Sequence, residues 1–220
     1  MIEAVVFDLD GLLLDSEQVW DEVREVITRE RGGRWHERAQ ADMMGMSSTE
    51  WSRYLHDELG LHEPPEELNR IVVERMEDQY RERLPVVEGT VEAVRRIGAR
   101  WPLGLASSSN RPLIDLALEL MGVADLFRVT VSSEEVERGK PAPDVYLEAA
   151  RRLGVRPENV VAIEDSANGI RAAKAAGLLV IAIPNPHFPP LDDVLAQADL
   201  VLEVLAELTP DAVESASSRP

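Results

Sequence analysis

Ala4-Val5-Val6-Phe7-Asp8-Leu9-Asp10-Gly11, near the start of the chain, is the stretch from which the fold can be inferred. Its apolar, β-branched and aromatic residues predict a short buried strand, and its glycine predicts a turn directly afterwards. Asp8 and Asp10 therefore stand at the carboxyl end of this strand, where ligands bind in open α/β sheets. Two carboxylates this close repel each other unless a cation or a shared proton offsets the repulsion. The stretch predicts a metal site, an acid/base site, or both.

Further apolar runs have the same character as the first. We expect buried parallel strands at Ile2–Phe7, Leu103–Ala106, Val129–Ser132, Val160–Ile163, Leu179–Ile183 and Leu200–Leu202. Helical patterns fall between most of them, at Thr90–Ile97, Leu113–Met121, Ala142–Leu153 and Asn168–Ala176. Strands that alternate with helices predict an α/β fold, in which helices cover both faces of a parallel sheet.

The interval after the first strand differs from the others. Roughly seventy residues, from Asp15 to Pro85, contain no convincing strand pattern and are expected to form helices. A helical insert beside the active edge of a sheet is typical of a cap or lid. We therefore predict a catalytic core formed by residues 1–14 and 86–208, a helical cap at 15–85, and a loose, polar C-terminal tail at 209–220.

The composition limits the partners that the protein is expected to have. Its 220 residues carry a net charge of −18, which repels nucleic acid and anionic membranes, so neither is an expected partner. The absence of cysteine excludes disulfides, thiolate metal sites and cysteine nucleophiles. With no leader sequence and no apolar run of membrane-spanning length, we expect a cytoplasmic protein. A monomer is the default expectation for this size.

The first acidic pair has both a chemical and a structural interpretation. Asp8 could act as a nucleophile on phosphorus and give an aspartyl phosphate, which splits one difficult hydrolysis into two easier steps. Asp10 could protonate the leaving alcohol and then deprotonate the attacking water. Taken alone, however, Asp-x-Asp-Gly is a weak signal, because both acids could be ordinary turn residues after a strand.

A second acidic pair, Glu164 and Asp165, follows the expected strand Val160–Ile163. If this strand lies beside the first, three or four carboxyl oxygens converge, and such hard ligands suit Mg²⁺. The alternative is that Asp165 or Ser166 caps a following helix, and both interpretations can hold together.

Polar residues also follow the expected strand Leu103–Ala106. Ser107, Ser108 and Asn110 come directly before a helix, where hydroxyls and free backbone N–H groups can hold a phosphate, although they could also serve only as caps. Lys140 lies in a proline-rich turn that would fix its position and could supply positive charge for substrate phosphate. Taken alone, Lys140 could equally be a solvated turn lysine.

Together these clusters resemble the motifs of the haloacid dehalogenase-like hydrolase superfamily, in the branch with a helical cap after the first strand. Asp8-Leu9-Asp10-Gly11 is similar to the first motif, Ser107 to the second, Lys140 in Gly-Lys-Pro-x-Pro-Asp to the third, and Glu164-Asp165 to the fourth. The resemblance runs from Ile2 to about Pro184, which is nearly the whole chain.

This resemblance implies a Rossmann-like, three-layer core, a Mg²⁺ cofactor and phosphoryl transfer through Asp8. It also implies that Mg²⁺ is held by the Asp8 carboxylate, the Asp10 backbone carbonyl and Asp165, with Glu164 assisting. The expected activity is Mg²⁺-dependent hydrolysis of a small phosphate monoester through an aspartyl phosphate. The substrate would be a small phosphorylated metabolite, and a sugar phosphate is the preferred candidate.

Two other kinds of protein share part of this pattern. Phosphomutases of the β-phosphoglucomutase type, which act on a hexose 1-phosphate, carry a histidine where this chain has Trp20, and they use an arginine and a lysine near Met46 and Met76. These three differences favour a phosphatase. A phospho-accepting signalling module would also use an acidic Mg²⁺ site and a lysine. Such modules are about half this length and have no cap.

The expected cap contains a group of methionines and tryptophans with two possible roles. These residues are Trp20, Met43, Met44, Met46 and Trp51. They could line the substrate pocket and give apolar surface over a sugar face, and we assign Trp20 to substrate binding on this ground. The alternative, which we favour for the group as a whole, is that they pack the small core of the cap.

Overall fold

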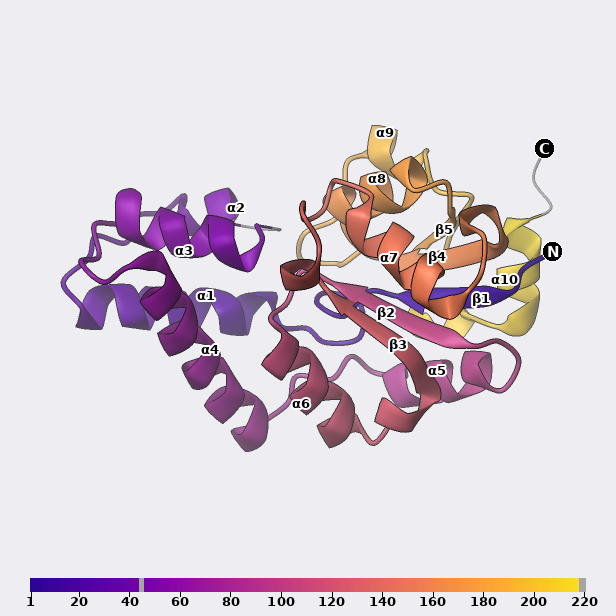
Figure 1. Cartoon of the computed structure of the whole chain (residues 1–220), viewed down its shortest axis with the longest axis horizontal. Helices are drawn as coiled ribbons and strands as arrows, with labels where there is room; N and C mark the ends of the chain where they lie inside the picture. Colours follow the sequence, from indigo (N-terminus) through magenta and orange to yellow (C-terminus); the bar gives the residue numbers. More distant parts are fainter. Residues whose placement is uncertain (44–45, 218–220) are drawn as a thin grey trace.

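The protein, described by a computed structural model over residues 1–43 and 46–217, is built on one six-stranded sheet (Figure 1). The strands are β1 (Ala4–Phe7), β2 (Leu103–Ser107), β3 (Phe127–Ser132), β4 (Val160–Glu164), β5 (Leu179–Ala182) and β6 (Leu200–Val201). Their order across the sheet is β3-β2-β1-β4-β5-β6, and every pairing is parallel. The α/β fold with a Rossmann-like parallel sheet is therefore confirmed.

The sequence of β1 explains why the sheet is buried on both sides. Val5 and Phe7 point into one hydrophobic cluster, whereas Ala4 and Val6 point into a second cluster. Because successive side chains of a strand alternate between the two faces, these clusters lie on opposite sides of the sheet. A strand with apolar residues at every position is thus suited to the centre of a three-layer structure.

Helices from different parts of the chain cover the two faces. The first cluster includes residues of α5 (Thr90–Gly98), α6 (Arg111–Met121) and α10 (Pro210–Ala216), and the second includes residues of α7 (Asp144–Leu153), α8 (Ala167–Ala175) and α9 (Asp192–Leu195). Short 3₁₀ helices lie at Ala124–Leu126, Ser133–Glu135, Pro157–Asn159 and Leu205–Glu207. Within the described part of the chain, no helix has the length and apolar character needed to cross a membrane.

The interval between β1 and α5 is helical, as expected. It contains α1 (Glu17–Glu30), α2 (Ala39–Met43), α3 (Ser48–Asp57) and α4 (Pro65–Glu82). These four helices pack against one another beside the sheet, and β1 runs toward them (Figure 1). The carboxyl end of β1 therefore faces the helical insert.

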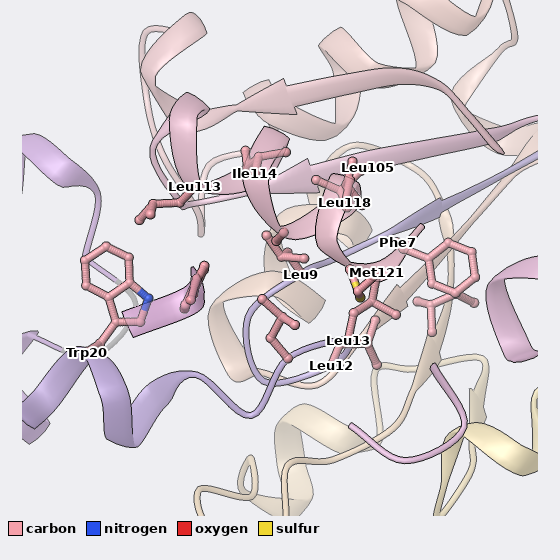
Figure 2. Packing of buried hydrophobic residues seen from close by; sticks show 14 of the residues in the cluster. Phe7, Leu9, Leu12, Leu13, Trp20, Leu105, Leu113, Ile114, Leu118 and Met121 are labelled. Atoms are coloured by element: carbon pink, nitrogen blue, oxygen red, sulfur yellow. The ribbon is translucent and has the colours of Figure 1, made fainter. Parts of the chain in front are cut away.

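The first cluster extends from the sheet into this insert. Figure 2 shows Trp20, on α1, at one end of a packed group that includes Leu9, Leu13 and Phe7. Leu9 and Leu13 belong to the turn that follows β1, and both are fully buried. This turn therefore joins the core of the sheet to the core of the insert without a break.

The C-terminal stretch differs from the expected loose tail. Residues Pro210–Ala216 form helix α10, and the Thr209 side chain caps its first turn by accepting a hydrogen bond from the Ala212 backbone. Val213 and Ala216 are buried against the first cluster. The expectation of a loose tail was wrong for these residues because the polar composition on which it was based includes Thr209-Pro210, which is good chemistry for the start of a helix.

Candidate active site

The order of the strands brings three of the four polar clusters to one edge of the sheet. Strand β1 pairs with β2 on one side and with β4 on the other. Asp8, Ser107 and Glu164 stand at or just after the carboxyl ends of these strands. Because the central position of β1 makes β2 and β4 its direct neighbours, Ser107 and Glu164, which follow Asp8 by 99 and 156 positions in the sequence, meet around it.

Lys140 is the positive centre of this site. Its ammonium nitrogen lies 2.6 Å from Asp8 Oδ1 and 2.6 Å from Glu164 Oε1, and all three side chains are buried. Burial alone would lower the pKa of Lys140, but the charges and hydrogen bonds of both carboxylates outweigh it and raise the pKa. Lys140 therefore stays charged at neutral pH, and the predicted approach of this turn lysine to the acidic cluster is seen.

Glu164 is held in place by more donors than the sequence indicated. Its Oε1 accepts hydrogen bonds from Lys140 and from the Tyr146 hydroxyl, at 2.6 and 2.5 Å. Its Oε2 accepts from the backbone N–H of Asp165 at 3.1 Å and from the Ser166 hydroxyl at 3.2 Å. This carboxylate is completely buried, so these bonds stabilise its position and charge.

Gly169 makes room for Glu164. A Cβ atom at this position of α8 would overlap the Glu164 carboxyl group, which cannot easily move because it is bonded on both oxygens. Gly169→Ala is therefore expected to destabilise the fold by about 1–3 kcal/mol, despite the higher helix propensity of alanine. Urea unfolding measures this, with exposed Arg171→Ala in the same helix as the control. Equal stabilities of the two variants would contradict the prediction.

Asp8, Glu164 and Asp165 form a cluster that fits a divalent cation. One ligand atom of each lies within 4.8 Å of the others, and all three residues are buried. Asp165 Oδ1 is buried without a hydrogen-bond partner, as expected for an oxygen that a cation would bind. Burial raises the pKa of Asp165 well above its usual value, and the charges of Glu164 and Asp8 add to this. A cation would relieve this crowding of carboxylates.

The charge of the cluster predicts a pH-dependent response to Mg²⁺. Burial raises the pKa of Asp8 to about 8, against the opposing effect of Lys140. Because the unfolded value is near 4, the folded metal-free protein loses stability as the pH rises from about 4 to 8, where Asp8 must give up its proton. A cation can replace that proton, so the gain in Tm caused by Mg²⁺ should be larger at pH 8 than at pH 6.

Thermal unfolding at both pH values, with Na⁺ at matched ionic strength as the control, measures this gain. If one proton is displaced per ion, the apparent affinity rises by up to about tenfold per pH unit. Equal gains in Tm at pH 6 and pH 8 would speak against a cation bound by these carboxylates.

Asp10 has a separate environment from Asp8. Its Oδ1 accepts hydrogen bonds from Ser16 at 2.6 Å and from the Trp20 indole at 3.3 Å, and its Oδ2 accepts from Ser109 at 2.6 Å and Ser107 at 3.2 Å. The Asp10 carboxylate is therefore oriented by four donors and lies outside the cation cluster. Its predicted contact with Mg²⁺ concerned the backbone carbonyl and stays a prediction.

The predicted phosphate-binding residues are not all brought together. Ser108 lines the main cavity together with Lys140, as a phosphate ligand should. Ser107 is fully buried, and its hydroxyl donates to Asp10. Asn110 donates to Asn69 of α4 and to Glu134, at 3.0 and 2.7 Å, so it joins the helical insert to the core. These two hydrogen bonds do not favour a contact between Asn110 and phosphate. The predicted phosphate-binding role of Asn110 stays a prediction.

The predicted methionines and tryptophans of the insert are both packed and exposed to a cavity. Trp20, Met43 and Trp51 are buried in the first cluster, and Met46 is partly buried against it. All four also line a small cavity of about 50 Å³ beside Asp10. Met44 lies outside the described residues. The two roles that the sequence left open are therefore compatible in this structure.

The cavity that contains Asp8 and Lys140, called the main cavity for that reason and not for its size, opens at the carboxyl edge of the sheet. It has a volume of about 340 Å³ and is lined by Asp8, Asp10, Lys140 and Asp165 from the edge, and by Glu17 and Ala41 from the insert. The opposite wall is formed by Asn185 and by residues 188–191, an apolar loop after β5. A cavity of this size is at the lower end of the range for small-molecule sites.

Sequence reasoning missed several residues that orient the site. Ser16, Ser109 and Tyr146 each hydrogen-bond a carboxylate of the site, and Gly169 accommodates Glu164. Ser109 was part of the noted Ser107-Ser108-Ser109 run, and this was the one available signal for it. Tyr146 looked like an ordinary apolar position of a helix, because nothing local to it indicates a buried carboxylate.

The fold and the site define a class of enzyme: a parallel α/β hydrolase with a lysine, a nucleophile candidate and a cation cluster at the carboxyl edge of its sheet. The family model described as haloacid dehalogenase-like hydrolase matches residues 2–177. This chain belongs to the haloacid dehalogenase-like hydrolases. The family and the enzyme class inferred from the four motifs are therefore confirmed.

Named relatives agree with this assignment over most of the chain. Hexitol phosphatase B of Escherichia coli is 34% identical over 227 residues, covering 94% of this chain and 95% of its own. The phosphorylated carbohydrates phosphatase of Thermotoga maritima is 33% identical over 178 residues, covering 80% and 82%. The crystal structure of CbbY from Rhodobacter sphaeroides in complex with phosphate superimposes with a TM-score of 0.87 at 28% identity, covering 97% of this chain and all of the other.

Proposed function

We propose that this enzyme is a Mg²⁺-dependent phosphatase that hydrolyses a small phosphorylated sugar or polyol through an aspartyl phosphate on Asp8. The observation that carries the proposal is the separation of the two first-strand carboxylates. Asp8 contacts Lys140 at the cation cluster, whereas Asp10 is oriented by hydroxyls and an indole. Two carboxylates held in different environments are suited to two different roles.

Each role follows from the groups that surround it. Asp8 Oδ would attack phosphorus, and the ester bond to the leaving alcohol would break as Asp10 protonates that alcohol. In the second step Asp10 would take a proton from water, which then cleaves the phosphate from Asp8. Lys140 and Ser108 would hold the phosphate oxygens, and Mg²⁺ would supply further positive charge for the phosphoryl group at Asp8, Glu164 and Asp165.

The substrate class is supported by the size of the cavity and by the named relatives. A volume of about 340 Å³ fits a small metabolite rather than a protein or nucleic acid. The two curated relatives described above are named for phosphorylated hexitols and carbohydrates. A phosphomutase is not better supported, because Trp20 stands where such mutases carry a histidine.

We propose further that residues 15–85 act as a cap over a core formed by residues 1–14 and 86–208. Glu17 and Ala41 of the insert line the main cavity, and Asn69 of the insert hydrogen-bonds Asn110 of the core. Substrate specificity would then depend on the insert, since phosphate itself would be bound by the core.

Asp10→Asn tests the acid/base role separately from the nucleophile. The amide keeps the size of the side chain but cannot accept a proton from water, so hydrolysis of the phosphoenzyme is expected to slow by about 10²–10⁴-fold. With an aryl phosphate such as p-nitrophenyl phosphate, whose leaving group needs no protonation by Asp10, acid-quenched protein would then carry phosphate on Asp8, detected by mass spectrometry. Normal turnover of Asp10→Asn would remove Asp10 from the mechanism.

The proposed function is tested by measuring phosphate release from a panel of sugar, polyol and nucleotide monophosphates with Mg²⁺. Release from one or a few esters, abolished by EDTA and by Asp8→Asn, is the expected result. If no ester is hydrolysed, the phosphatase proposal fails. Isomerisation of a hexose 1-phosphate would in that case be measured next.

A further inference from the structure

Arg24 is a buried cation in the helical insert that no part of the proposed chemistry uses. It lies on α1, one turn after Trp20, and only 9% of its surface is exposed. Its guanidinium carbon is 4.6 Å from the ring centre of Trp20 and 5.0 Å from that of Trp51. These indoles stabilise the positive charge and fix the position of the side chain.

The hydrogen-bonding groups of Arg24 are not used within the described part of the chain. The buried Nε has no hydrogen-bond partner, and no hydrogen bond or ion pair joins the guanidinium to any described residue. Exposed arginines of the same molecule, such as Arg70 and Arg29, do form ion pairs with carboxylates. The nearby carboxylates of Glu17, Asp21 and Asp10 favour the charge of Arg24. Its buried Nε nevertheless lacks a hydrogen bond, which is unfavourable and suggests a missing hydrogen-bond partner.

The position of Arg24 indicates where this partner would come from. Arg24 lines the small cavity of about 50 Å³ together with Asp10, Glu17 and Ser108. These same three residues line the main cavity that contains Asp8 and Lys140. The two cavities therefore meet at Asp10, Glu17 and Ser108. A substrate whose phosphate lies beside Asp8 and Lys140 would extend past Asp10 toward Arg24.

We propose that Arg24 binds a carboxylate at the end of the substrate remote from the phosphate, which makes phosphorylated sugar acids or hydroxy acids the preferred substrates. This inference rests on the proposed function and changes its substrate class from neutral sugars and polyols to the corresponding acids. A guanidinium offers parallel N–H donors that match the two oxygens of a carboxylate. The cavity has room for about three water-sized atoms, which suits a carboxylate better than a second phosphate.

Glu17 supports a carboxylate at this position. Burial and the charge of Asp10 raise the pKa of Glu17 to about 7, even though the Arg24 charge opposes this shift. Near neutral pH Glu17 can therefore carry a proton and donate it in a hydrogen bond to a carboxylate oxygen. Arg24 and Glu17 together would then provide donors for both oxygens.

The test uses pairs of substrates that differ only at the remote end. Gluconate 6-phosphate is compared with glucitol 6-phosphate, and glycerate 3-phosphate with glycerol 3-phosphate, because each pair exchanges a carboxylate for an alcohol. The variants are Arg24→Met, which keeps an apolar stem between the indoles, and Arg24→Lys, which keeps the charge. Arg29→Met, exposed on the same helix, is the control.

The wild-type enzyme is expected to prefer the acid of at least one pair. Arg24→Met should raise the KM for that acid by about 10- to 100-fold, with the KM for the alcohol and the kcat nearly unchanged, and Arg24→Lys should restore part of the loss. Arg29→Met should leave both substrates unaffected. A wild type that prefers the alcohols, or an equal loss on acid and alcohol in Arg24→Met, would overturn the proposal.

A binding measurement separates this proposal from the proposed function. Calorimetric titration of gluconate 6-phosphate and glycerate 3-phosphate into the inactive Asp8→Asn protein needs no turnover. If no ester is hydrolysed, the phosphatase proposal fails. The carboxylate-binding role of Arg24 is still supported if one of these acids binds more tightly to Asp8→Asn than to Asp8→Asn/Arg24→Met. Equal affinity in the two proteins would overturn it. Should Arg24→Met fail to fold, Arg24→Gln takes its place.

Discussion

Asp8→Asn is expected to lower phosphate release by at least about four orders of magnitude, because the amide cannot attack phosphorus. The protein should still fold. The Asp8 carboxylate is crowded by Glu164 and has a pKa raised by burial to about 8, so its replacement by a neutral group of the same size removes a repulsion. Lys140 keeps its contact with Glu164 in this variant.

Steady-state kinetics and thermal unfolding at pH 8 without metal check both parts of this prediction. Asp115→Asn, an exposed change on α6, is the control for the substitution itself. More than about one per cent of residual activity would exclude Asp8 as the nucleophile. A clear fall in Tm would show instead that the carboxylate supports the fold.

Lys140→Met should destabilise the protein by about 3–5 kcal/mol at pH 8 and lower activity by at least about 10²-fold. The substitution removes the cation that lies 2.6 Å from both Asp8 and Glu164 and leaves two buried carboxylates unpaired. The pKa of Asp8, which the charge of Lys140 lowers in the wild type, then rises further, and protonation of Asp8 relieves the repulsion at low pH. The destabilisation is therefore expected to be smaller at pH 5 than at pH 8.

The second lysine of the chain provides a matched control. Lys174 forms an ion pair with Asp199 at 2.9 Å, but both side chains are partly exposed, so Lys174→Met should cost about 1 kcal/mol or less. Urea unfolding of both variants at the two pH values measures the difference. Similar stabilities of Lys140→Met and Lys174→Met would show that the buried cluster does not depend on its lysine.

The sequence was sufficient to predict the sheet and the edge at which the site lies. Apolar residues at every position of β1 and at the first four positions of β4 are typical of strands buried on both faces, and the acidic residues that follow these runs mark the carboxyl edge. The four clusters were therefore correctly located even where single residues were ambiguous. Lys140 is the clearest example, since its proline-rich turn alone did not distinguish it from a solvated lysine.

Contacts between side chains that are distant in the sequence could not be predicted. Tyr146 donates to Glu164 across 18 residues, and Asn110 bonds Asn69 across 41 residues. Such contacts depend on how α7 packs on the sheet and how α4 docks on α6, and neither is encoded in a local pattern. Helix α10 was missed for a local reason, because a Thr-Pro start is equally typical of a turn.

The four donors to Asp10 come from two parts of the molecule. Ser16 and Trp20 belong to the start of the helical insert, whereas Ser107 and Ser109 belong to the end of β2. One carboxylate thus tethers the insert to the sheet. Any tilt of α1 away from the sheet would break the two bonds from Ser16 and Trp20 while those from β2 persist. The number of hydrogen bonds that orient this carboxylate therefore depends on where the insert lies relative to the sheet.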